Sequence, residues 1–163
     1  MSEWKRVCCA VDFSEPSRLA LEEAVDLCRR SGAELTIVHV RTPPPPTAVD
    51  LLASPGEAAR AVAEEVELAI AAWGVSAEGK LERPVATAVL VGSAAGEIVR
   101  YARRHPIDLL VVATQGRTGL GRLLLGSVAE RVVREAPCPV LVVRRREGSL
   151  EEDAEEAAMY GTA

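Results

Sequence analysis

Short apolar runs alternate with longer stretches of mixed polarity along most of this chain. Five of the runs consist mainly of Val, Leu, Ile, Ala and Cys, a composition typical of strands that are covered on both faces of a sheet. We therefore predict strands at residues 7–11, 35–40, 85–91, 109–113 and 140–143. The run 85–91 follows Pro84, which favours a position at an edge of the sheet.

The stretches between these runs carry apolar residues at the spacing of amphipathic helices. The first helix is predicted to begin after Ser14, a residue suited to the N-cap, with Pro16 in its first turn. It is predicted to run to about Arg30, because the glycine of Ser31-Gly32 is typical of a helix C-terminus.

The second helix is predicted to begin at Ser54-Pro55 and to end at Gly74. Its expected inward-facing stripe consists of Val62, Val66, Ala69, Ile70 and Trp73. A third helix is expected at about residues 95–104, before Pro106, and a fourth begins close to Gly126. Strands that alternate with helices in this way imply parallel pairing, with helices on both faces of the sheet.

The predicted fold is therefore an α/β domain, a doubly wound parallel sheet of five strands with helices on both faces, over residues 1–146. Residues 147–163 form a separate tail with six acidic and no basic residues, whereas residues 1–146 hold 18 acidic and 19 basic residues. Because the body is nearly neutral and has no basic, aromatic-studded surface, nucleic acid is an improbable ligand. No apolar run approaches the length of a membrane span, and no signal peptide is evident, so a cytoplasmic location is expected.

Four cysteines are present, Cys8, Cys9, Cys28 and Cys138, and their spacing matches neither a CxxC motif nor a metal site. Strand alternation places Cys8 and Cys9 on opposite faces of the first strand. We interpret the four as buried, reduced thiols, since free cysteine is commonly buried.

The candidate chemistry lies after the fourth strand, where Gly116, Gly119, Gly121 and Gly126 precede a helix. Glycine lets backbone N–H groups approach a ligand closely, and the first N–H groups of a helix attract anions. This loop can therefore hold phosphate. The same residues also permit a purely structural interpretation, in which the run 127–130 (SVAE) is a capping box with Ser127 as the N-cap.

A second candidate, Asp12, directly follows the first strand, at the end of the sheet where doubly wound proteins bind ligands. An aspartate at this position can equally cap the turn that follows it. His39 lies inside the second predicted strand, and we interpret it as a core histidine with a hydrogen-bond partner rather than as a catalyst.

The segment GRTGLGRLLLGSVAERVVREAPCPVLVVR closely resembles the C-terminal half of the universal stress protein family. ATP-binding members carry Gly, two residues, Gly, nine residues and then Gly-Ser or Gly-Thr. Gly116 and Gly126-Ser127 keep the nine-residue spacing, whereas the first glycine position is occupied by Ala113. The added Cβ of alanine disfavours close approach of a ligand to the backbone at that position.

The resemblance implies the strand order 3-2-1-4-5 and a site at the C-terminal ends of strands 1 and 4. It also implies that the ligand is ATP, which Mg²⁺ can accompany. AMP and cyclic AMP stay open as alternative ligands. Asp12 and Val40 would contact the base, while amides near Gly116 and from Gly126 to Val128 would hold the phosphates. The complete set of residues assigned to the site is Ala10, Val11, Asp12, Val40, Val112, Ala113, Gly116, Arg117, Gly126, Ser127 and Val128.

Universal stress proteins commonly dimerise through the fifth strand, so the resemblance also implies a homodimer that pairs Val140–Val143 with its copy. We compare three hypotheses for the function of this protein. The first is a nucleotide-binding stress or regulatory protein, with at most slow ATP hydrolysis, and the second is a nucleotide-free interaction module, which the alanine at position 113 supports. The third, an adenylating enzyme, is disfavoured because neither an SGGxDS loop nor a Walker A loop is present.

Overall fold

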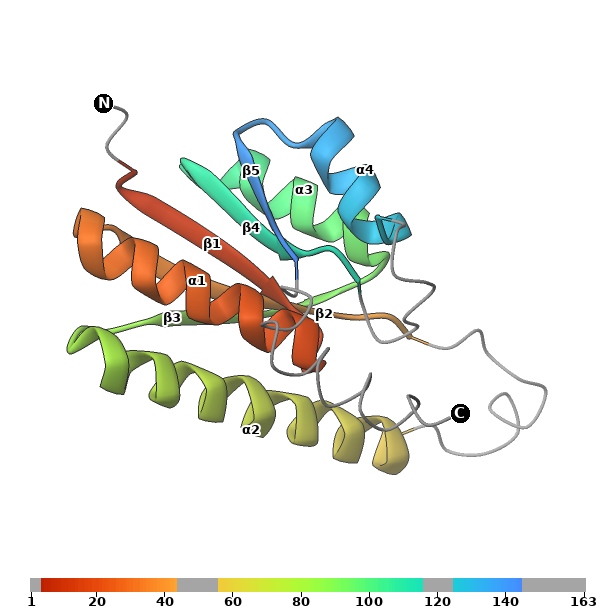
Figure 1. Cartoon of the computed structure of the whole chain (residues 1–163). Helices are drawn as coiled ribbons and strands as arrows, with labels where there is room; N and C mark the ends of the chain where they lie inside the picture. Colours follow the sequence, from red (N-terminus) through yellow and green to blue (C-terminus); the bar gives the residue numbers. More distant parts are fainter. Residues whose placement is uncertain (1–3, 44–55, 116–124, 145–163) are drawn as a thin grey trace, which may run out of the picture.

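A computed structural model of the chain describes residues 4–43, 56–115 and 125–144. Helices and strands alternate along these residues as the apolar pattern predicts (Figure 1). The elements in chain order are β1 (Arg6–Val11), α1 (Glu15–Ser31), β2 (Glu34–Arg41), α2 (Gly56–Leu81), β3 (Ala86–Val91), α3 (Ala94–Arg104), β4 (Leu109–Ala113), α4 (Ser127–Glu135) and β5 (Val140–Val143).

The five strands form one parallel sheet in the order β3-β2-β1-β4-β5. Helices α1 and α2 cover one face of the sheet, and α3 and α4 cover the other (Figure 1). Both the predicted fold class and the predicted strand order are confirmed. The expected edge position of β3 is also confirmed, and β5 forms the opposite edge.

Two apolar layers hold the sheet between its helices, and strand alternation divides the side chains between them. Cys9 and Ile37 belong to the layer under α1 and α2, whereas Cys8, Val38 and Leu110 belong to the layer under α3 and α4. The predicted separation of Cys8 and Cys9 is therefore confirmed.

All four cysteines are free thiols, and three of them are fully buried as expected, while Cys138 is half-buried. Burial raises the pKa of Cys8 to about 12 and that of Cys28 to about 11, because the apolar layers do not solvate a thiolate. These thiols therefore stay protonated at neutral pH and serve as small apolar core residues.

Helix α1 begins and ends at the predicted signals. The Ser14 hydroxyl caps the helix by accepting a hydrogen bond from the backbone N–H of Ser17 at 3.3 Å, and Pro16 lies in the first turn. At the other end Gly32 has a left-handed φ of 76°, and its N–H donates to the Cys28 carbonyl at 2.9 Å. A glycine at this position ends the helix without the steric conflict of a Cβ.

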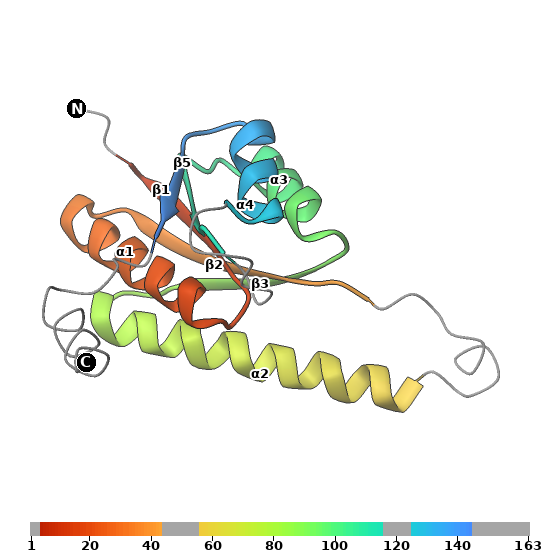
Figure 2. The ribbon, with the colours of Figure 1, turned by 45° about the vertical axis from the view of Figure 1, so that its right-hand side comes forward.

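Helix α2 departs from the prediction in two ways. It continues through Gly74 to Leu81, and Val62, expected to face inward, is 52% exposed. Gly74 lies inside the helix where it packs on β3, since an added Cβ would stand 2.8 Å from Cγ2 of Thr87. Val62 is exposed because the N-terminal part of α2 extends past the start of α1 (Figure 2), so less of the fold covers it.

Gly74→Ala is expected to destabilise the protein by about 1 kcal/mol, although alanine favours helix, because the stiff Thr87 side chain occupies the space of the new methyl group. Thr87→Ser removes Cγ2, so in that background the same change is expected to stabilise by up to about 1 kcal/mol. Urea unfolding of the four proteins measures both values. Equal destabilisation in both backgrounds would show that the contact with Thr87 is not the reason for the glycine.

Within the ranges that the structure describes, no helix combines the length and apolar character needed to cross a lipid bilayer.

Candidate nucleotide-binding site

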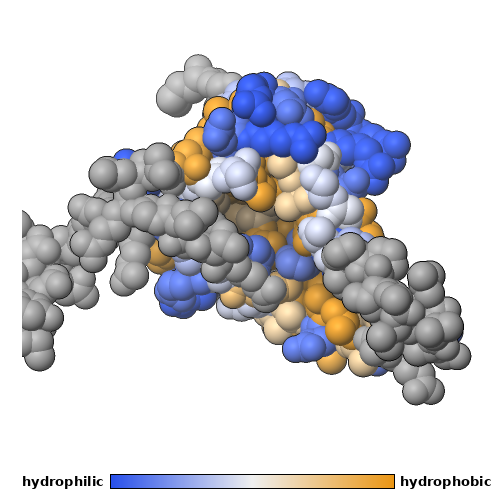
Figure 3. Space-filling view, turned by 90° about the vertical axis from the view of Figure 1, so that its right-hand side faces the viewer, coloured by the Kyte–Doolittle hydropathy of each residue, from blue (hydrophilic) through white to orange (hydrophobic). Residues whose placement is uncertain are grey.

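A cavity of about 210 Å³ opens at the C-terminal ends of β1 and β4. These strands are neighbours at the centre of the sheet, and the chain winds outward from them in opposite directions, to β2 and β3 on one side and to β5 on the other. Doubly wound sheets leave a crevice at such a reversal. Figure 3 looks onto this end of the molecule and shows a hollow with apolar residues inside it.

The structure brings together segments of the predicted site that lie about a hundred residues apart in the chain. All of the predicted residues that it describes line the cavity, namely Ala10, Val11, Asp12, Val40, Val112, Ala113, Gly126, Ser127 and Val128. Gly116 and Arg117, also predicted, lie outside the described residues.

Several lining residues were not predicted from the sequence: Ser17, Val38, Ala94, Ile98, Thr114, Gln115 and Ala129. Val38 shares a strand face with Val40, so alternation alone could have identified it. Ala94 and Ile98 come from α3, which begins at the same end of the sheet. No sequence motif identifies Ala94 and Ile98 as site residues, because they contribute only apolar surface to the cavity wall.

Asp12 serves the turn after β1 and also faces the cavity. Its Oδ1 accepts hydrogen bonds from the backbone N–H of Ser14, at 3.0 Å, and from the Ser14 hydroxyl. Its own backbone N–H donates to the Ser17 hydroxyl at 3.2 Å. The structural interpretation of Asp12 as a turn cap is therefore confirmed.

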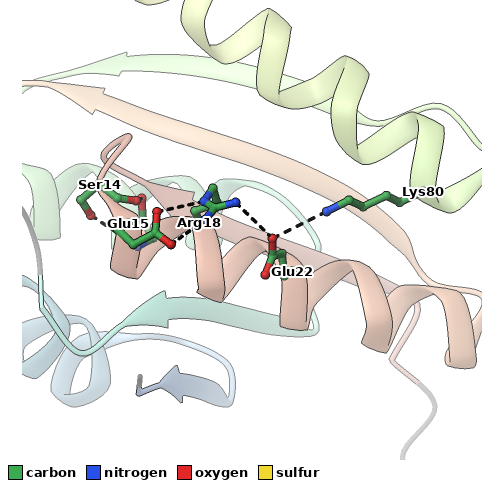
Figure 4. A network of polar contacts seen from close by, with 6 residues as sticks. Ser14, Glu15, Arg18, Glu22 and Lys80 are labelled. Atoms are coloured by element: carbon green, nitrogen blue, oxygen red, sulfur yellow. Dashed lines mark hydrogen bonds and ion pairs between the residues drawn. The ribbon is translucent and has the colours of Figure 1, made fainter. Parts of the chain in front are cut away.

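Two basic side chains, Arg18 and Lys80, are engaged on the outer surface between α1 and α2 (Figure 4). Arg18 binds Glu15 at 2.6 Å and Glu22 at 3.7 Å, and Lys80 of α2 reaches the same Glu22 oxygen at 3.7 Å. Arg18 and Lys80 line a separate groove, and neither lines the cavity. They are therefore not placed to neutralise an anion bound there.

Helix α4 points its N-terminus at the cavity, but its cap differs from the prediction. Gly126 is the N-cap: its carbonyl accepts the N–H of Glu130 at 2.9 Å, and no side chain caps the helix. The predicted capping box with Ser127 as N-cap is therefore wrong, because Ser127 is already the first helical residue.

The backbone amides at this helix end differ in what they can offer a ligand. The N–H of Gly126 donates to the Thr114 carbonyl at 2.6 Å, so it is occupied. The N–H groups of Ser127, Val128 and Ala129 belong to the first turn and have no acceptor within the helix. Together with the helix dipole they form an anion-binding end, and Ser127 adds a hydroxyl.

His39 lies between the lining residues Val38 and Val40 in β2 but does not itself line the cavity. It is 8% exposed, and its Nδ1 makes a 2.8 Å hydrogen bond with the Val11 carbonyl at the end of β1. The interpretation as a core histidine with a partner is confirmed. Among the described lining residues Asp12 alone carries a formal charge, so within them the attraction for an anion comes from backbone dipoles.

Comparison with known proteins agrees with this geometry. A sequence model of the universal stress protein family matches residues 3–144. The chain belongs to this family. A universal stress protein of Methanocaldococcus jannaschii is 34% identical over an alignment 152 residues long, which covers 87% of this chain and 83% of that protein.

Solved structures of the family share the fold of this member. UspA from Lactobacillus plantarum superposes with a TM-score of 0.77 at 28% identity, over 88% of this chain and 100% of that one. A universal stress protein in complex with cAMP superposes with a TM-score of 0.61 at 25% identity, over 88% of this chain and 98% of that one. The family assignment made from the glycine-rich segment is confirmed.

Proposed function

We propose that this protein binds an adenine nucleotide, with ATP as the preferred ligand, in the cavity at the ends of β1 and β4. The observation that carries the proposal is that one cavity is lined both by Asp12 and by the first-turn residues of α4, whose amides have no acceptor within the helix. A carboxylate can accept hydrogen bonds from a nucleoside, and helix N-terminal amides donate to phosphate oxygens. The two ends of a nucleotide thus have complementary partners.

The cavity walls suggest how the nucleotide would lie. Val38 and Val40 of β2 and Ile98 of α3 supply apolar surface beside Ala10, which suits the flat faces of a purine ring. Asp12 lies at the end of β1, and α4 begins beyond β4. We therefore place the base against β2 and α3, and the phosphates at Ser127 and Val128.

The complex of a family member with cAMP supports an adenine nucleotide as the ligand class. AMP and cAMP are therefore tested beside ATP, and Mg²⁺ would accompany the phosphates of ATP. We expect the protein to act by binding, in a stress response or its regulation, with at most slow ATP hydrolysis.

Asp12→Asn is expected to weaken ATP binding about fivefold, because a neutral amide replaces the charged acceptor at the proposed base contact. Asparagine keeps an oxygen for the Ser14 N–H, so the turn is preserved. Isothermal titration with ATP, AMP and cAMP, with and without Mg²⁺, measures the affinities. The matched control is Asp26→Asn, which removes an exposed carboxylate of α1 that is paired with Arg29 at 2.9 Å.

Equal affinities of the Asp12 and Asp26 variants would remove Asp12 from the site. Absence of any heat or thermal shift with the natural sequence at millimolar nucleotide would reject the proposed function. It would favour the nucleotide-free interaction module, in which Ala113 replaces the first glycine of the ATP-binding motif.

We further propose that the protein forms a homodimer through antiparallel pairing of β5. Within the described residues β5 has one partner strand, β4. The carbonyls of Pro139 and Val143 accept the N–H groups of Leu110 and Thr114, so these alternate residues face β4. Val140 and Val142 therefore direct their backbone groups to the open edge, where a second copy can pair with them.

Val142→Pro is expected to convert the dimer to a monomer, since it deletes an outward N–H while leaving the bonds to β4 in place. Sedimentation equilibrium measures the mass, and Val142→Thr is the control that keeps the N–H and the β-branched shape. A natural-sequence protein that sediments as a monomer at tens of micromolar would contradict the proposed interface.

A further inference from the structure

The turn that follows β1 contains a phenylalanine in a backbone conformation that usually selects glycine. Phe13 has a φ of 63°, in the left-handed region, where a Cβ is disfavoured. Of the described residues outside glycine, only Glu82 shares this feature. A bulky side chain keeps such a strained conformation only where the surrounding structure stabilises it, so the contacts of its ring must do so here.

The ring of Phe13 is held on the side of the sheet that α1 and α2 cover. It stacks on His39, with ring centroids 4.4 Å apart and an interplanar angle of 30°. It also meets Trp73 of α2 edge to face, at 5.4 Å and 80°. His39 is itself anchored by its hydrogen bond to the Val11 carbonyl, so the ring is clamped between two side chains of the folded core.

The residue before Phe13 belongs to the wall of the cavity. Asp12 lines it, and the hydrogen bond from the Ser14 N–H to Asp12 Oδ1, at 3.0 Å, spans Phe13. A left-handed central residue brings these two groups together, as in turns that asparagine and aspartate side chains close. Phe13 does not line the cavity. The turn therefore has the Phe13 ring on the side that packs under α1 and α2, and Asp12 on the side that faces the cavity.

We propose that Phe13 is a positioning residue for nucleotide recognition. The clamp of His39 and Trp73 on its ring holds the left-handed turn, and the turn holds the Asp12 carboxylate toward the base. The inference rests on the proposed function, because it assigns to Phe13 an effect on a ligand that Asp12 contacts.

The test compares Phe13→Gly with the natural sequence. Glycine adopts the left-handed conformation without steric conflict but has no ring, so it separates the backbone requirement from the clamp. Titration with ATP is expected to show about fivefold weaker binding for Phe13→Gly, no more than the loss expected for Asp12→Asn, because Phe13 acts through that carboxylate. In the Asp12→Asn background the same change is expected to alter the affinity by less than about twofold, because the group that Phe13 positions is already altered.

Each outcome distinguishes the inference from the function on which it rests. If the natural sequence binds ATP and Phe13→Gly binds it equally well, the inference is overturned and the proposed function stands. The inference also fails if the losses from Phe13→Gly and Asp12→Asn add, since Phe13 would then not act through Asp12. If the natural sequence does not bind ATP, both the inference and the proposed function are rejected. If Phe13→Gly does not fold, Phe13→Leu, which keeps an apolar side chain, takes its place in the same test.

Discussion

Ser127→Pro is expected to weaken ATP binding by about tenfold to a hundredfold while leaving the fold intact. Ser127 is the first residue of α4, and its backbone N–H is one of the donors proposed to hold phosphate. Hydrogen bonds to charged groups contribute about 1.5–3 kcal/mol, which corresponds to this range of affinity. Proline at this position deletes that amide donor together with the serine hydroxyl.

The backbone at the start of α4 is already suited to proline. The first helical position tolerates it because its N–H has no acceptor within the helix. Gly126 precedes it with φ −60° and ψ 149°, the extended conformation that a residue before proline prefers. The midpoint of thermal unfolding is therefore expected to change by no more than about 3 °C.

Ser127→Ala is the matched control, because it removes the hydroxyl and keeps the amide. It is expected to weaken ATP binding by only about twofold, in keeping with the loss of one neutral hydrogen bond. Titration calorimetry of the two variants separates the amide from the side chain. Equal effects of the two would assign phosphate binding to the hydroxyl, and normal binding by the proline variant would exclude this helix end from the site.

Leu110→Ala is expected to destabilise the folded protein by about 2–5 kcal/mol. The Leu110 side chain is 0% exposed and packs in the layer that α3 and α4 cover, from β4 between β1 and β5. Truncation there leaves a cavity that the two neighbouring strands cannot close without disturbing their own pairing. Urea unfolding with linear extrapolation measures the change in the free energy of unfolding.

Leu68→Ala makes the same chemical change on the outer surface of α2, where the leucine is 73% exposed. This control is expected to change the free energy of unfolding by less than about 0.5 kcal/mol, because little apolar surface is buried there and alanine favours helix. Comparable losses in the two variants would mean that Leu68 is covered in solution, and a loss below about 1 kcal/mol for Leu110 would contradict the described core.

Local patterns predicted most of the elements because the signals they use act over a few residues. The runs at β4 and β5 were predicted with the observed bounds, and the ends of α1 follow from Ser14 and Gly32. Local signals failed where a distant segment changed their meaning. Gly74 reads as a helix end, yet it is an interior residue whose missing Cβ lets α2 lie against Thr87 of β3.

The candidate site shows the same division. Asp12 and the Gly126-Ser127 pair stand out by residue type and by resemblance to the family, and both line the cavity. The alternative interpretation, a capping box, put the N-cap one residue too late, because serine is a better cap than glycine by type alone. In the structure Gly126 also donates to Thr114 across the loop, a contact that no local rule contains.

The sequence by itself determined the alternation of buried strands and amphipathic helices, the two faces of each strand and the ends of α1, since these depend on neighbours within a turn or a pleat. It also carried the family resemblance from which the strand order was inferred. Only the tertiary structure decided that the Gly126 amide is bonded to the Thr114 carbonyl, that α3 forms one wall of the cavity, and that Phe13 takes a left-handed turn against His39 and Trp73. These features arise from contacts between segments far apart in the chain, whose energies depend on how the whole sheet and its helices pack.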